Sequence, residues 1–195
     1  MLSSISPVGE YARDQRWSST VTAYLLGSLL GGVMMGAVAG GSGMLLLGTY
    51  SATTRLLALA VATSIGLLAD RWGRVPTLHR QVDQRWLSTY RGWVYGAGFG
   101  LQLGVGVVTI VPSSIVWVLW VGAVLTADIR VGIAVGAVFG VGRALPLVAG
   151  GRIATVGQLR GWMQRMDRSR SAAARTTSVA QGVVGVIGVA VWAFT

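Results

Sequence analysis

Long apolar runs alternate with short arginine-rich segments along the 195 residues of this chain. A helix needs about 20 mainly apolar residues to cross the hydrocarbon core of a bilayer. The pattern therefore predicts an all-α protein, a polytopic membrane helix bundle with about five transmembrane helices. A cytoplasmic N-terminal segment over 1–19 is expected to precede one transmembrane domain over 20–195. The predicted spans are about 20–48, 52–70, 93–126, 129–150 and 178–194.

Two of the predicted spans contain residues that interrupt helices. Pro112 lies in the middle of 93–126, where it removes a backbone hydrogen bond and bends the chain. We predict one helix broken at Pro112, with two separate helices as the alternative. Near the end of the first span, the run Gly40-Gly41-Ser42-Gly43 predicts a second break.

The distribution of arginine, the only basic residue type, predicts the sidedness. An excess of arginine in short loops marks the cytoplasmic side. The basic loops 71–92 and 151–177 are both cytoplasmic only if an even number of spans separates them. One broken helix over 93–126 and one over 129–150 satisfy that condition. We therefore expect a multi-pass protein of a bacterial cell (inner or plasma) membrane with a cytoplasmic N-terminus.

Composition narrows the chemistry and the partners. The chain is 53% apolar and only 11% charged, whereas soluble domains carry about 25% charged residues. Its net charge of +10 sits beside apolar spans, so anionic lipid headgroups on the cytoplasmic side are the expected partner and nucleic acid is not. With no cysteine, one histidine and six acids, we predict no cofactor, no metal site and no thiol–disulfide chemistry.

Two stretches of the basic loops predict amphipathic interfacial helices that lie on the membrane surface. One has Leu159, Trp162, Met163 and Met166 at helical spacing, and the other has Leu78, Val82 and Trp86. The alternative is that these apolar faces dock a cytoplasmic partner. The residues expected at the lipid headgroups are Arg80, Arg85, Trp86, Arg160, Trp162, Arg165 and Arg168.

Glycines recur at every fourth position in several predicted spans. Membrane helices approach one another closely through such small residues. Packing within the bundle is the expected role, and a dimer or partner interface is the alternative. The series are Gly27/Gly31, Gly32/Gly36/Gly40, Gly96/Gly100/Gly104 and Gly132/Gly136/Gly140.

The glycine-rich stretch 98–106 followed by Val-Pro-Ser-Ser over 111–114 resembles the broken helix of the DsbD/CcdA transmembrane family. In that family a glycine-rich half-helix runs into Pro-Cys. The stretch 140–146 resembles another glycine-rich helix of the family, and 182–188 resembles its last span. The likeness covers Trp93 to the C-terminus, and Thr20 to Asp70 more weakly.

The departures from that family concern its chemistry. Its members pass reducing equivalents through two cysteines, whereas Ser113 follows Pro112 here, and a hydroxyl cannot form a mixed disulfide. The family's first helix also has no counterpart. The resemblance thus implies a shortened, cysteine-free relative without redox activity. Because the superfamily includes small-solute exporters, it leaves transport open.

A few polar residues inside the predicted spans are candidate site residues. Those near the Pro112 break either satisfy freed backbone groups or line a solute path. Arg143 lies inside the fourth span, and an intramembrane arginine is a functional hypothesis by default. We predict an ion pair between Asp70 and Arg143 or snorkelling of Arg143 to lipid phosphates. Binding of an anionic solute or of a partner's carboxylate is the alternative. The candidate residues for the helix break or solute path are Thr109, Pro112, Ser113, Ser114, Arg143 and Pro146.

Two functions fit these patterns. The first is a non-catalytic accessory or scaffold subunit of a membrane complex, with other membrane subunits or further copies of the chain as partners. The alternative is a small-solute (anion) transporter of the DsbD/CcdA-like superfamily. We do not expect an enzyme, because no nucleophile and base stand together in the predicted spans.

Overall fold

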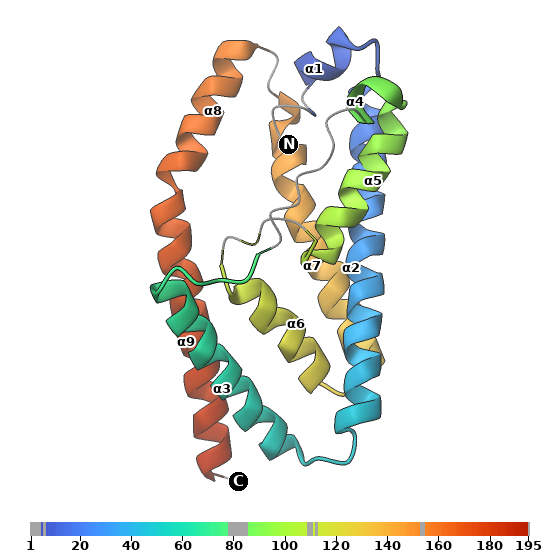
Figure 1. Ribbon diagram of the computed structural model, residues 1–195. Helices are drawn as coiled ribbons and strands as arrows, with labels where there is room; N and C mark the ends of the chain where they lie inside the picture. The colour runs from blue at the N-terminus through green and yellow to red at the C-terminus, as the bar shows by residue number, and fades with distance from the viewer. Residues whose placement is uncertain are drawn as a thin grey trace.

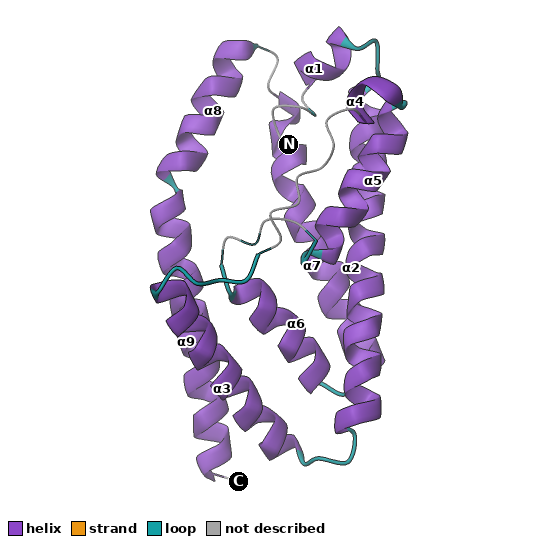
Figure 2. Ribbon diagram, viewed as in Figure 1, coloured by secondary structure: helices purple, strands orange, loops and turns teal. Residues whose placement is uncertain are grey.

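The computed structural model describes residues 5, 7–77, 86–108, 111, 113–152 and 155–194, and all regular structure in them is helical (Figures 1 and 2). The prediction of an all-α chain is confirmed for these residues. The helices are α1 (Pro7–Ala12), α2 (Trp17–Leu47), α3 (Ala52–Arg71), α4 (Trp86–Thr89), α5 (Gly92–Val105), α6 (Ile115–Leu125), α7 (Ile129–Ala149), the short 3-10 helix Gly150–Arg152, α8 (Val156–Arg168) and α9 (Arg170–Phe194).

The helices form two groups that α6 connects. α2, α5 and α7 pack together, and α3 pairs with α9 (Figure 1). α6 contacts both α2 and α3, so it lies between the groups. α2 is therefore the helix around which most of the molecule is arranged.

Glycines allow α2 and α7 to touch backbone to backbone. A Cβ added at Gly32 would meet the carbonyl oxygen of Gly136, and one added at Gly36 would meet that of Gly132. The reverse additions on α7 meet α2 in the same way. Since these glycines face another helix of the same chain, their spacing serves packing within the bundle.

A second glycine contact joins α2 to α5. A Cβ at Gly100 would meet the carbonyl oxygen of Tyr24, and one at Gly104 would meet that of Ser28. The buried hydroxyl of Ser28 also donates to the carbonyl oxygen of Gly140 on α7, at 2.7 Å. One turn of α2 thus contacts both neighbouring helices.

Among the described residues, three helices are long and apolar enough to cross a membrane: α2, α3 and α7. This supports a helical membrane protein, but with three candidate spans where we predicted five. The predicted span 93–126 is divided between α5 and α6, of 14 and 11 residues, each shorter than a crossing needs. The predicted span 178–194 is the later part of α9, whose side chains beyond Ala190 lie outside the described residues.

α5 and α6 nevertheless follow one another along α2, as expected of one broken element. Gly96 of α5 packs on Thr20 near the start of α2, and Val124 of α6 packs on Gly43 near its end. α5 stops at Gly106, whose φ of 81° lies in the left-handed region that glycine accepts readily. Pro112 itself lies outside the described residues.

The predicted break over Gly40–Gly43 is wrong, because α2 continues through it to Leu47. The missing side chains let other backbone atoms approach instead. A Cβ at Gly40 would meet the carbonyl oxygen of Asp128, and one at Gly43 would meet that of Val124. Glycine here marks close packing and not a helix end.

α8 continues nearly in line with α9 (Figure 1). The amide of Ser169 donates to Arg165 and the amide of Ala173 donates to Ser169, so hydrogen bonding runs on across the junction. α8 begins at a capping box formed by Thr155 and Gln158. The predicted helix is present, and its place on a membrane surface stays a prediction. The other predicted interfacial helix has only Trp86 among the described residues, at the start of α4.

We predict that Gly136→Ala destabilises the protein by about 1–3 kcal/mol, because its Cβ forces α7 away from α2. Thermal unfolding in detergent, monitored by size-exclusion chromatography, measures the effect. Gly142→Ala is the matched control, since a Cβ there meets nothing within 4 Å. Equal melting temperatures for the two variants would contradict the close contact.

Candidate functional site

A polar cluster connects the end of α3 to the break between α5 and α6. The Asp70 carboxylate accepts hydrogen bonds from the Ser113 hydroxyl at 3.0 Å, the Ser114 hydroxyl at 2.8 Å and the Ser114 backbone amide at 2.8 Å. Ser113 and Ser114 are two of the predicted site residues. Asp70 therefore serves as an acceptor for the start of α6.

Two more side chains satisfy backbone groups at the same break. The Thr77 hydroxyl accepts from the Val111 amide at 2.9 Å. The Arg143 guanidinium donates to the Gly106 carbonyl oxygen at 3.4 Å. Non-helical backbone is tolerated in apolar surroundings only when such partners exist. These contacts support the structural role that we weighed against a solute path.

The predicted ion pair between Asp70 and Arg143 is not formed, although both residues are described. Asp70 is bonded to the serines, while the Arg143 guanidinium lies 5.4 Å from the centre of the Phe139 ring and reaches Gly106. Both charged residues serve the break, but from different helices. The spacing of residues along the chain could not show this, because it does not place α3 relative to α7.

Gln181 of α9 extends the Asp70 cluster into the second helix group. Its side-chain amide donates to the Ser114 hydroxyl at 2.8 Å. Only 2% of Gln181 is exposed, and its side-chain oxygen has no hydrogen-bond partner in the described part of the chain. A single cluster thus connects α3, α6 and α9.

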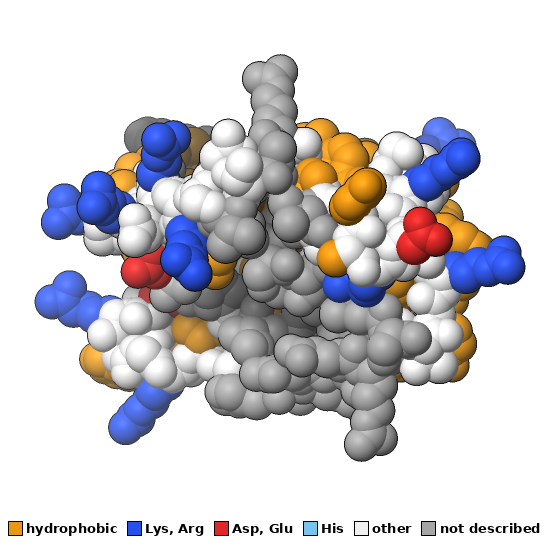
Figure 3. All heavy atoms as spheres, turned by 90° about the horizontal axis from the view of Figure 1, so that it is seen from above, with side chains coloured by type: hydrophobic (Ala, Val, Ile, Leu, Met, Phe, Trp, Pro, Cys, Tyr) orange, Lys and Arg blue, Asp and Glu red, His pale blue; other side chains and the backbone are white. Residues whose placement is uncertain are grey.

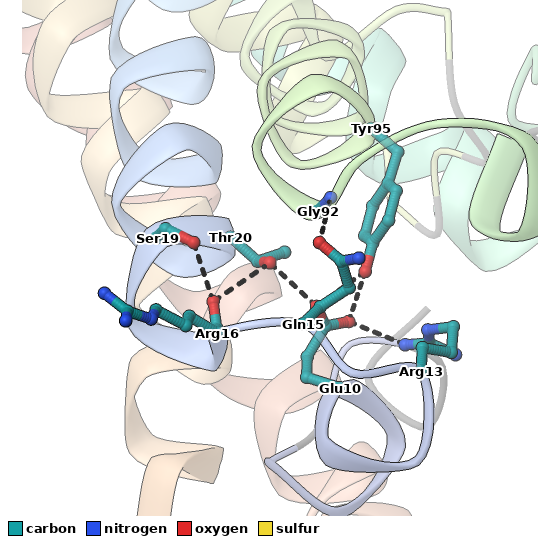
Figure 4. Close-up of polar contacts among 8 residues, drawn as sticks. All are labelled: Glu10, Arg13, Gln15, Arg16, Ser19, Thr20, Gly92 and Tyr95. Atoms are coloured by element: carbon teal, nitrogen blue, oxygen red, sulfur yellow. Dashed lines mark hydrogen bonds and ion pairs between the residues drawn. The ribbon is translucent and has the colours of Figure 1, made fainter.

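A second polar cluster surrounds Glu10, which sequence patterns did not reveal (Figure 4). Glu10 is fully buried. It accepts from the Tyr95 hydroxyl at 2.6 Å and the Thr20 hydroxyl at 2.7 Å, and it pairs with Arg13 at 2.6 Å. Nearby, the Gln15 side chain accepts from the Gly92 amide at 3.0 Å. The N-terminal segment is thereby attached to the starts of α2 and α5.

The charge of Arg13 is stabilised in this cluster. Partial burial disfavours the guanidinium, but the hydrogen bond to Glu10 and the interactions with Tyr95 and the Glu10 charge together outweigh it and raise the pKa of Arg13 above its ordinary value. The one signal in the sequence was an acid, Glu10, in a segment expected to be cytoplasmic. Nothing in the sequence linked it to Tyr95.

The remaining predicted residues are dispersed. Thr109, Pro112, Arg80 and Arg85 lie outside the described residues. Pro146 lies inside α7. The predicted headgroup residues of α8 are exposed at Arg160, Arg165 and Arg168 and half-buried at Trp162. Figure 3 looks onto the end of the molecule where α1 and α8 lie and shows basic side chains around its rim.

Comparison with known proteins gives a consistent set of relatives. The chain is 28% identical over 173 residues to "Methylamine utilization protein MauF" of Methylophilus methylotrophus, covering 86% of this chain and 61% of the relative. It is 28% identical to that of Paracoccus versutus, covering 89% and 65%, and 31% identical to that of Methylorubrum extorquens, covering 73% and 52%.

This chain is similar to MauF. It spans between about half and two thirds of the length of these bacterial relatives. No protein-family model matches the chain. No solved structure matches it either.

The predicted resemblance to the DsbD/CcdA family is wrong. The relatives are named MauF, and nothing in the comparisons points to DsbD/CcdA proteins. The glycine pattern that suggested it has another origin here, since Gly100 and Gly104 pack on α2. The transport alternative rested on that resemblance and on the Pro112 break and Arg143, and the comparisons do not support it.

We predict that Asp70→Ala lowers stability by about 1–3 kcal/mol, because the Ser114 amide loses its acceptor. Thermal unfolding in detergent provides the measurement, and Asp70→Asn should lose less because one acceptor oxygen remains. If Asp70→Ala and the wild-type protein have the same melting temperature, the carboxylate does not stabilise the break between α5 and α6.

We also predict that Tyr95→Phe costs about 1.5–3 kcal/mol, since the buried Glu10 carboxylate loses a charge-assisted hydrogen bond. Limited proteolysis should then cut the segment before α2 faster than in wild type. The exposed Tyr90 provides the matched control, Tyr90→Phe. Identical cleavage rates for both variants would show that the N-terminal segment is held by other contacts.

Proposed function

We propose that this chain is a non-catalytic membrane protein that supports methylamine utilization in bacteria alongside other proteins. The similarity to MauF carries the proposal, because it extends over 73–89% of the chain in the relatives described above. As the chain spans only part of those relatives, their role is proposed here and not assumed.

The surface of the helices supports a membrane location. Leu26, Leu30, Met34 and Val38 form an exposed apolar face on α2. α3 and α9 likewise expose valine, leucine and isoleucine. Contiguous exposed apolar surface of this kind is typical of contact with lipid or with other membrane chains. We therefore propose that α2, α3 and α7 lie in the bilayer.

The two buried acid clusters support a non-catalytic role. Glu10 and Asp70 each accept hydrogen bonds from donors on other segments. These hydrogen bonds hold the N-terminal segment and the α5–α6 break. They support a role of both carboxylates in the fold.

Deleting the gene for this chain in its own bacterium should abolish growth on methylamine as sole nitrogen source and leave growth on ammonium unchanged. Reintroducing the wild-type gene should restore growth. In cells grown on methylamine, the chain should sediment with membranes and copurify in mild detergent with a protein absent from ammonium-grown cells. Normal growth of the deletion strain on methylamine would refute the proposal.

A further inference from the structure

Two hollows follow one another between α3 and α9, with volumes of about 450 and 460 Å³. Both are lined by Leu67, so they adjoin one another along the helix pair, and together we call them the α3–α9 groove. One part is lined by Thr63, Ser64, Gly182, Gly185, Val186 and Val189. The other part reaches Asp70, Arg71, Ser113 and Ser178.

The first part of the groove is apolar despite its two hydroxyl residues. The Thr63 hydroxyl donates to the carbonyl oxygen of Leu59 and the Ser64 hydroxyl to that of Ala60. Both hydroxyls are thereby occupied on their own helix. On α9, Gly182 has nothing within 4 Å of an added Cβ. This part of the groove is therefore open space lined by methyl and methylene groups.

The groove is long enough for a hydrocarbon chain. Its lining on α9 extends from Ala174 to Ala190, which is about 24 Å at 1.5 Å per residue. One leaflet of a bilayer has a hydrocarbon depth of about 15 Å. An acyl chain can therefore lie along the groove over the whole depth of a leaflet.

The other end of the groove carries one positive and one negative group. Arg71 is exposed beside Asp70 at the end of α3. A carboxylate has about four acceptor positions, and Asp70 uses three of them for the serines. The remaining acceptor and the guanidinium match a headgroup that bears an ammonium and a phosphate.

We propose that the α3–α9 groove binds one aminophospholipid of the phosphatidylethanolamine class. Its acyl chain lies along Ser64, Gly182 and Val186, its phosphate contacts Arg71, and its ammonium donates to Asp70. The 20 residues of α3 place this headgroup site at the surface of a bilayer that α3 crosses. The inference rests on the membrane location proposed above.

The test is lipid binding to the full-length chain, purified in detergent and stripped of lipid, followed by native mass spectrometry. Phosphatidylethanolamine should bind about tenfold more tightly than phosphatidylglycerol, which lacks the ammonium, and than diacylglycerol, which lacks the headgroup. Equal binding of diacylglycerol would overturn the headgroup assignment, and equal binding of phosphatidylglycerol would overturn the role of Asp70.

Two pairs of variants test the two ends of the groove. Gly182→Leu fills the apolar part and should abolish binding, while Gly142→Leu, at an equally open glycine of α7, should not. Arg71→Ala should weaken binding about tenfold, while Arg74→Ala, outside the groove lining, should not. Circular dichroism establishes that each variant is folded. Binding unchanged by Gly182→Leu would refute the site.

The two proposals fail in different ways. If the deletion strain needs this chain for growth on methylamine but the purified chain binds no phosphatidylethanolamine, the groove assignment alone is wrong. If the chain binds the lipid at this groove but the deletion strain grows normally on methylamine, the proposed function alone is wrong.

Discussion

Direct backbone contact along α2 determines where the other helices of the larger group lie. Gly27 and Gly31 of α2 face α5, whereas Gly32 and Gly36 face α7. In lipid, apolar side chains have no drive to associate, so the attraction between helices comes from close packing and weak polar contacts between backbones. A helix with two glycine faces can hold two neighbours in this way. Because carbonyl oxygens occupy the space that side chains would need, the arrangement leaves little freedom for sliding.

The break between α5 and α6 leaves backbone groups without helical partners, and polar side chains from several segments provide those partners. Three different segments supply its partners: Thr77 after α3, Asp70 at the end of α3, and Arg143 on α7. Gln181 then connects α9 to the same point. Of the residues that suggested a solute path, Ser114 and Arg143 therefore make hydrogen bonds at this break.

The sequence predicted local features well and long-range ones poorly. α3 and α7 begin and end within a residue or two of the predicted spans, because Ser51 and Asp128 cap contiguous apolar runs. The interruption of the helix before α6 was predicted from Pro112. The contact of Glu10 with Tyr95 could not be predicted, since it joins an N-terminal segment to α5 by tertiary packing alone.

The errors share a cause, which is the ambiguity of glycine. At Gly40 and Gly43 a supposed helix break is a packing surface. In α5 a spacing that resembled the DsbD/CcdA family reflects contact with α2. Glycine spacing indicates that something approaches closely, but it does not identify the neighbour. A family resemblance built on such residues in apolar sequence is correspondingly weak evidence of descent.

The pairing of α3 with α9 has a consequence for biosynthesis. α3 is complete at Arg71, whereas α9, a helix it packs on, begins only at Arg170. Until α9 is made, the face of α3 around Thr63, which packs near Gly185, has no protein neighbour from that helix. In a nascent chain stalled before residue 170, the face of α3 that packs on α9 would therefore stay uncovered by that helix.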